Sequence, residues 1–141
     1  MNTNPAVTAN RILQEQIEIE ELTVHLLSEL AKRQCVRQRI VKLFQDLRER
    51  VVAHFCDEER GGFVEQQVRD NPELAAMCRD LCREHQGLHA ELDELLQIAE
   101  NRPVDNQWWE ALENRFHDVS IKLANHEFRE NAILQELVDE E

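Results

Sequence analysis

Apolar residues recur every three or four positions along most of this 141-residue chain, and polar residues fill the positions between them. This spacing is typical of amphipathic α-helices, because about 3.6 residues make one turn. The pattern predicts four helices, at about residues 8–33, 36–60, 73–100 and 105–138. At about 1.5 Å per residue each is roughly 35–50 Å long, so the four helices can lie side by side.

Three breaks in the pattern separate the predicted helices. They are AKRQCVRQR (31–39), the stretch from Gly61-Gly62 to RDNPE (69–73), and ENRPVDNQ (100–107). Within the second break, Asn71 can cap a helix and Pro72 suits its first turn. Within the third, Pro103 breaks the chain, and Asp105 or Asn106 can serve as the next N-cap.

Links this short force consecutive helices to run antiparallel. The sequence therefore predicts an all-α fold, an up-down-up-down antiparallel four-helix bundle, over residues 10–138. We expect residues 1–9 to form a flexible N-terminal segment. The longest link can hold an extra helical turn at FVEQQV (63–68).

Composition and charge narrow the class of protein. The chain has three glycines, three prolines and no tyrosine, which suits a helical protein. Its net charge of −13 argues against nucleic acid or an anionic membrane as a partner. We find no apolar run near the ~20 residues that span a bilayer, and no signal peptide. Four cysteines without a CxxC pair suit a reducing compartment, so we expect a cytoplasmic protein; its oligomeric state is left open.

Polar residues interrupt the apolar stripe of every predicted helix. The expected interior positions are Ile12, Leu13, Ile17, Leu22, His25, Leu26 and Leu30 in the first helix, and Ile40, Leu43, Phe44, Leu47, Val51, His54 and Glu58 in the second. In the third they are Leu74, Met77, Cys78, Leu81, Cys82, His85, Leu88, His89, Leu92, Leu95 and Leu96. In the fourth they are Trp109, Leu112, Phe116, Val119, Leu123, His126, Glu130, Ile133, Leu134 and Leu137. Buried imidazoles and carboxylates are costly when unpaired, so they need a common partner.

The seven polar residues of these stripes predict a metal site. They are His25, His54, Glu58, His85, His89, His126 and Glu130. Three helices carry a pair four residues apart, which places both side chains on one face, one turn apart. Five imidazoles and two carboxylates are too many ligands for one ion and suit two ions bridged by the carboxylates. A mixed nitrogen and oxygen donor set indicates iron first.

The order H…HxxxE…HxxxH…HxxxE over four helices resembles the hemerythrins and the bacterial hemerythrin-like (HHE cation-binding) domains. The likeness covers about residues 10–138 and is carried by AHFCDEE, REHQGLHAEL and LANHEFRENAIL. It implies a metal-binding cofactor of two non-haem iron ions, bridged by carboxylates and an oxo or hydroxo group. It also implies reversible binding of dioxygen or another small diatomic ligand, and no enzymatic activity.

By position, the resemblance assigns His85, His89 and His126 to one iron. It assigns His25 and His54 to the other, which keeps a free coordination position. Glu58 and Glu130 look like the bridging carboxylates. On the first helix, Glu18 and Glu21 are alternative ligands to His25.

One residue departs from the pattern of the oxygen-carrying hemerythrins. They have an aspartate five residues after the last histidine, where this chain has Asn131, so Glu130 is the candidate ligand. Bacterial HHE domains with this variant handle iron, sense oxygen or redox state, or respond to nitric oxide. Three alternatives therefore stay open: iron storage or sensing, a redox enzyme acting on peroxide or nitric oxide, and a metal-free interaction bundle. A ferritin-like site is disfavoured because no ExxH pair occurs on facing helices.

His117 serves as an internal control. It lies nine residues before His126, half a turn out of phase, so we expect it to face away from the site. Cys78 and Cys82 share the face of His85 and are either small packing residues or a thiol pair that senses oxidation. Cys56 is expected to point away from His54.

Overall fold

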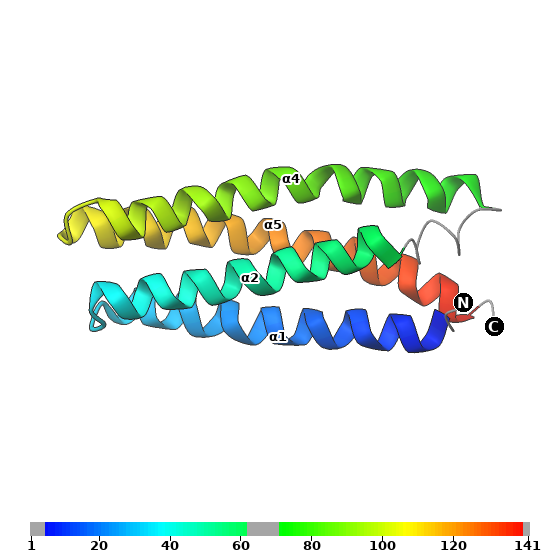
Figure 1. Cartoon of the computed structure of the whole chain (residues 1–141), viewed down its shortest axis with the longest axis horizontal. Coiled ribbons are helices and arrows are strands. Elements are labelled where there is room, and N and C mark those ends of the chain that lie inside the picture. Colours follow the sequence, from blue (N-terminus) through cyan, green and yellow to red (C-terminus); the bar gives the residue numbers. More distant parts are fainter. Residues whose placement is uncertain (1–4, 62–70, 140–141) are drawn as a thin grey trace.

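The computed structural model describes the backbone of residues 5–61 and 71–139, and the side chains of residues 10–59 and 71–136. It contains four long helices, labelled as in Figure 1: α1 (Pro5–Lys32), α2 (Arg37–Gly61), α4 (Pro72–Asn101) and α5 (Asn106–Asp139). The described residues hold no strand. Each helix agrees with a predicted one to within a few residues at either end. Helix α1 includes residues 5–9 of the expected flexible segment 1–9. Residues 1–4 and the turn at 63–68 lie outside the described residues, so what the sequence indicates for them stays a prediction.

The helices form an antiparallel bundle, as predicted. Figure 1 shows α4 running beside α5 and α2 beside α1, with consecutive helices pointing in opposite directions. The packed pairs are α1 with α2, α2 with α4, α4 with α5, and α5 with α1, so each helix has two main neighbours. This arrangement is the up-down-up-down bundle expected of long helices joined by short links.

Local side-chain bonds set where two of the helices begin. Asn71 Oδ1 accepts a hydrogen bond from the Leu74 N–H (3.1 Å), and Pro72 occupies the first helical turn of α4. Asp105 Oδ1 accepts one from the Trp108 N–H (2.9 Å) at the start of α5. Both bonds satisfy amide groups that a helix N-terminus leaves without a partner. Of the two predicted caps for α5, Asp105 is the one used.

Two apolar clusters fill the interior, and a layer of polar side chains lies between them. The larger cluster includes Phe44 and Phe116, whose rings meet edge to face with centroids 5.3 Å apart. The smaller cluster consists of Ile12, Leu74, Cys78, Leu81, Ile133 and Leu134. The buried residues between the clusters, here called the polar layer, are Gln16, His54, Glu58, His85, His126 and Glu130. The fold thus places polar groups from all four helices at one level of the bundle.

The predicted interior face of the first helix was partly wrong. Leu13 is 37% exposed and Ile17 is 48% exposed, so neither belongs to the core. The buried side chains among the described residues of α1 are Ile12, Gln16, Ile19, Leu26 and Leu30, and Leu22 packs against the larger cluster while partly buried. The five buried positions form a narrow seam that follows the steps of four and three of a seven-residue repeat, in which position 23 is the intervening one. Apolar residues next to these positions made the interior face that was predicted from the sequence too wide.

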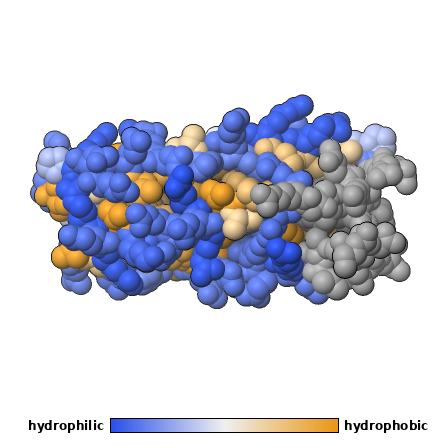
Figure 2. All heavy atoms as spheres, viewed as in Figure 1, coloured by the Kyte–Doolittle hydropathy of each residue, from blue (hydrophilic) through white to orange (hydrophobic). Residues whose placement is uncertain are grey.

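The outer surface is largely polar. Figure 2 shows hydrophilic side chains over most of the visible face, with hydrophobic ones between them in patches. Within the part of the chain that the structure describes, no helix combines the length and the apolar character that crossing a membrane requires. All four cysteines lie in that part, and none of them forms a disulfide.

Two phenylalanines of α5 give a matched test of this core. Phe116→Ala removes a ring that is 0% exposed, so we expect the free energy of unfolding to fall by about 3–5 kcal/mol. Phe128→Ala makes the same chemical change at a side chain that is 74% exposed, and should shift it by less than about 0.5 kcal/mol. Denaturant unfolding followed by circular dichroism measures both, and equal losses would contradict the placement of Phe116.

Candidate metal centre

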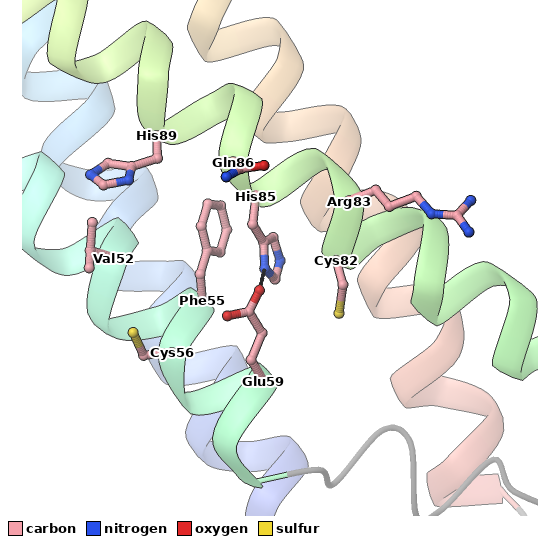
Figure 3. Close-up of a pocket in the computed structure, with 9 residues that line it drawn as sticks. All are labelled: Val52, Phe55, Cys56, Glu59, Cys82, Arg83, His85, Gln86 and His89. Atoms are coloured by element: carbon pink, nitrogen blue, oxygen red, sulfur yellow. Dashed lines mark hydrogen bonds and ion pairs between the residues drawn. The ribbon is translucent and has the colours of Figure 1, made fainter.

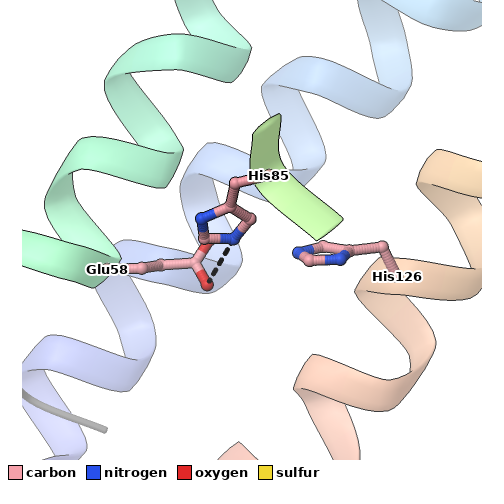
Figure 4. A group of neighbouring side chains, drawn as sticks. All are labelled: Glu58, His85 and His126. Atoms are coloured by element: carbon pink, nitrogen blue, oxygen red, sulfur yellow. Dashed lines mark ion pairs between the residues drawn. The ribbon is translucent and has the colours of Figure 1, made fainter. Parts of the chain in front are cut away.

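Five of the seven predicted ligands meet in the polar layer. They are His54 and Glu58 from α2, His85 from α4, and His126 and Glu130 from α5, all between 1% and 7% exposed. Their ligand atoms form two groups of three, each within 4.8 Å: one of Glu58, His85 and His126, and one of His54, Glu58 and Glu130. Figure 4 shows the first group, with the imidazoles of His85 and His126 turned toward the space beside Glu58. Because Glu58 belongs to both groups, the two candidate sites are adjacent.

Each buried carboxylate reaches two imidazoles with different oxygens. Glu58 Oε1 lies 3.0 Å from His54 Nε2, and Glu58 Oε2 lies 3.9 Å from His85 Nε2. Glu130 Oε1 lies 3.1 Å from His54 Nε2, and Glu130 Oε2 lies 3.5 Å from His126 Nε2. Both carboxylates therefore have one oxygen on the side of His54 and the other on the side of His85 and His126.

Several inward-facing atoms of the layer have no hydrogen-bond partner of suitable geometry among the described residues. They are Glu58 Oε1, His85 Nε2, His126 Nε2 and Glu130 Oε2. Leaving a buried polar atom unsatisfied costs about 1–3 kcal/mol, and more when the group is charged. Imidazole nitrogens and carboxylate oxygens that converge in this way are the donor set of a metal ion, once it has displaced the protons they carry. The residues present therefore fit a bound cation.

Three further glutamates, here called the outer glutamates, hold the imidazoles from behind. Each accepts a hydrogen bond from a histidine Nδ1–H: Glu15 from His54 (3.0 Å), Glu59 from His85 (3.0 Å) and Glu84 from His126 (3.2 Å). In a neutral imidazole this bond places the proton on Nδ1 and leaves Nε2 with its lone pair toward the centre of the bundle. A carboxylate behind a metal-binding histidine also makes the imidazole more basic and fixes its orientation. The sequence pattern did not predict these three glutamates, although each directly adjoins a residue of the polar layer in sequence.

The buried charges determine one another's protonation. Burial, reinforced by the neighbouring Glu130, raises the pKa of Glu58 well above its usual range. Burial acts on Glu130 in the same direction, but the nearby imidazoles of His126 and His54 outweigh it and hold the pKa of Glu130 well below its usual range. Burial lowers the pKa of His54, yet Glu130 and Glu15 together outweigh it and raise that pKa. Protons thus occupy the layer when cations do not, and cation binding must displace them.

On α1, a glutamine stands where the resemblance assigned a histidine. Gln16 is 5% exposed, and its Nε2 donates a hydrogen bond to Glu130 Oε1 (2.6 Å). His25 is exposed, with its Nε2 3.3 Å from Arg39 Nη2. It lies nine residues from Gln16, about 14 Å along the helix at 1.5 Å per residue. The structure therefore does not bring His25 to the centre.

The alternatives to His25 on this helix also lie away from the layer. Glu18 pairs with Arg50 on the surface (2.9 Å), and Glu21 is exposed. A strict seven-residue count from Ile12 would have placed Gln16 on the seam and His25 one position off it. The seven-residue repeat could therefore have predicted from the sequence that Gln16 faces the interior.

The second histidine of α4 is also outside the centre. His89 is half-buried, and its Nε2 lies 3.6 Å from Asp93 Oδ2, one turn along its own helix. Leu88, which is 4% exposed, takes the interior position after His85. The predicted stripe had allowed either Leu88 or His89 to face inward, and the narrower seam selects the leucine. His117 is exposed, as predicted.

Comparison with known proteins identifies the family. Residues 8–138 match the family described as Hemerythrin, the hemerythrin HHE cation binding domain. The chain belongs to this family. No curated protein and no solved structure shows significant similarity to it. Cation binding by this HHE domain agrees with the two adjacent groups of ligand atoms in its polar layer.

A substitution at an outer glutamate tests the support of the centre. In Glu84→Gln, His126 loses its anionic acceptor, so we expect metal affinity to fall about 10–100-fold. Glu91→Gln is the matched control, because Glu91 joins the same two helices through Lys122 (2.6 Å). Competition with a chromophoric chelator measures both affinities. Equal values for the two variants would contradict the role of Glu84.

Proposed function

We propose that this HHE domain holds two non-haem iron ions and reversibly binds dioxygen or a similarly small molecule. The observation that carries this proposal is the orientation of the two buried carboxylates. Glu58 and Glu130 each present one oxygen to His54 and the other to the opposite side of the polar layer. A carboxylate whose two oxygens lie beside different candidate ligands can bridge two ions.

The ligands divide unequally between the two proposed ions. His85 and His126 serve one, and His54 serves the other together with Gln16, whose amide can present its carbonyl oxygen after a flip. The two carboxylates are shared, and an oxo or hydroxo group is the proposed third bridge. Imidazole together with carboxylate favours iron over softer or harder ions. The set thus has three imidazoles in place of the five that the resemblance implies.

A small cavity beside the carboxylates is the proposed place for the small ligand. It is lined by Glu58, Cys78, Leu81, Cys82, Glu130 and Ile133, and has a volume of about 20 Å³. That volume admits about one water-sized molecule. Apart from the carboxylates its walls are apolar groups and thiols. A cavity of this size supports the binding of a small molecule rather than of an organic substrate.

A pair of reduced iron ions would supply the affinity for dioxygen and the electrons on which that binding draws. The chain supplies the rest. The outer glutamates orient the three imidazoles, Glu58 and Glu130 hold the two positions together, and the apolar clusters on either side keep solvent out.

The outer glutamates also favour a second candidate function, the sensing of iron or redox state. Three carboxylates behind the imidazoles make the ligands more basic, which stabilises the oxidised state of a metal centre. Such a centre oxidises more readily and releases its ligand less readily. We therefore keep sensing as the alternative, in the same cytoplasmic setting that the cysteines indicate.

Iron content tests the two-ion centre directly. After anaerobic loading, we expect two iron ions per chain in the wild type and fewer than two in His54→Ala, because His54 adjoins both carboxylates. His25→Ala removes an exposed imidazole and should keep two. Elemental analysis with circular dichroism measures content and helicity together. A wild type that takes up no iron would overturn the proposal and leave a metal-free bundle.

Exposure to air separates the two candidate functions. We expect the reduced, iron-loaded protein to develop a coloured form in air that bleaches when oxygen is removed, followed by absorption spectroscopy. Immediate oxidation that cannot be reversed by removing oxygen would favour sensing. Steady turnover of peroxide or nitric oxide well above that of free iron would instead indicate an enzyme.

A further inference from the structure

A groove between α2 and α4 opens beside one histidine of the centre. It has a volume of about 400 Å³, and its walls include Phe55, Glu59, Cys82 and His85. Figure 3 shows these side chains converging on the groove from the two helices. The Phe55 ring stacks on His85, with centroids 3.8 Å apart and planes 7° from parallel. His85 is therefore held with one edge toward the groove and the other toward the centre.

Three ligand types meet at the groove edge of His85. Glu59, Cys82 and His85 each offer one ligand atom, and these atoms lie within 4.8 Å of one another. On His85 the nitrogen that faces Glu59 is Nδ1, at 3.0 Å. Glu59 and Cys82 are exposed while His85 is buried, so an ion arriving from solvent meets two ligands before the third. Thiolate, imidazole and carboxylate together suit zinc, cobalt or ferrous iron.

The groove and the centre share residues. Cys82 lines the groove and also the small cavity formed with Glu58 and Glu130. His85 joins the two through its ring, with Nδ1 toward Glu59 and Nε2 toward Glu58 (3.9 Å). A cation in the groove is therefore one imidazole away from the proposed iron positions.

We propose that Cys82 Sγ, the Glu59 carboxylate and His85 Nδ1 form an outer cation site that binds a divalent metal before it reaches the centre. Its part in loading rests on the proposed function. Binding there releases the Cys82 thiol proton to solvent and moves the His85 proton from Nδ1 to Nε2. No electron transfer is involved.

The two positions compete for His85. A neutral imidazole has one lone pair, so His85 can hold an ion at Nδ1 or at Nε2 but not at both. Filling the centre through Nε2 returns the proton to Nδ1, where it is again donated to Glu59. The outer site thus loses one of its three ligands when the centre is full, which favours release of its ion.

Rapid mixing of the metal-free full chain with Co²⁺ tests this site. Cobalt bound to thiolate gives a charge-transfer band in the near-ultraviolet, and total cobalt is measured separately by elemental analysis. In the wild type we expect the thiolate band to rise and then to fall as the chain reaches two ions. Cys82→Ser should lose the band and fill the centre several-fold more slowly, with the same final content. Cys56→Ser is the matched control: Cys56 lines the same groove outside the three-ligand group, and should retain both the band and the rate.

The outcomes separate this proposal from the proposed function. A wild type that reaches two ions without the band, or an equal band in Cys82→Ser, overturns the outer site and leaves the two-ion centre intact. A band that persists at full strength with two ions in the centre overturns the competition for His85. A band that persists while the chain retains only one ion overturns the two-ion centre and supports the outer site alone.

Discussion

The burial of charge in one layer is the constraint on which the rest of this structure depends. Three imidazoles and two carboxylates lie almost wholly out of solvent, between two apolar clusters. Hydrogen bonds among these groups leave inward-facing nitrogens and oxygens without partners. Cations placed between them would satisfy the carboxylates and the imidazoles in place of the protons that occupy the layer without them. The buried polar layer therefore suits cation binding, which is consistent with membership of the HHE cation-binding family.

The outer glutamates extend that constraint to the surface. Glu15, Glu59 and Glu84 lie between neighbouring helices and reach solvent. Each also contacts one histidine of the polar layer and orients its ring. They fix which nitrogen of each ring faces inward. Near His85 the same arrangement brings a thiol and a carboxylate to one edge of the ring. The imidazole of His85 therefore faces the surface groove with one nitrogen and the buried layer with the other.

The sequence pattern predicted the four helices, their antiparallel order and the ligands of α2 and α5. The structure confirms the helices and their order, and it buries the candidate ligands His54, Glu58, His126 and Glu130, because Leu47, Val51, Leu123 and Ile133 mark the interior face clearly on either side of them. The sequence pattern failed for His25 and His89, each of which directly adjoins a buried leucine in sequence. A step of one residue turns a side chain by about 100°, so a stripe drawn one residue too wide admits a residue that belongs on the surface.

The sequence by itself determined the fold and the kind of chemistry, because periodicity and residue type are properties of each helix alone. The tertiary structure decided which ligands share a centre, because that depends on how far each helix is rotated and shifted against its neighbours. It placed Gln16 where a histidine was expected, and it set Glu15, Glu59 and Glu84 behind the imidazoles. Those contacts join residues from different helices, so they cannot be predicted from the spacing of residues within one helix.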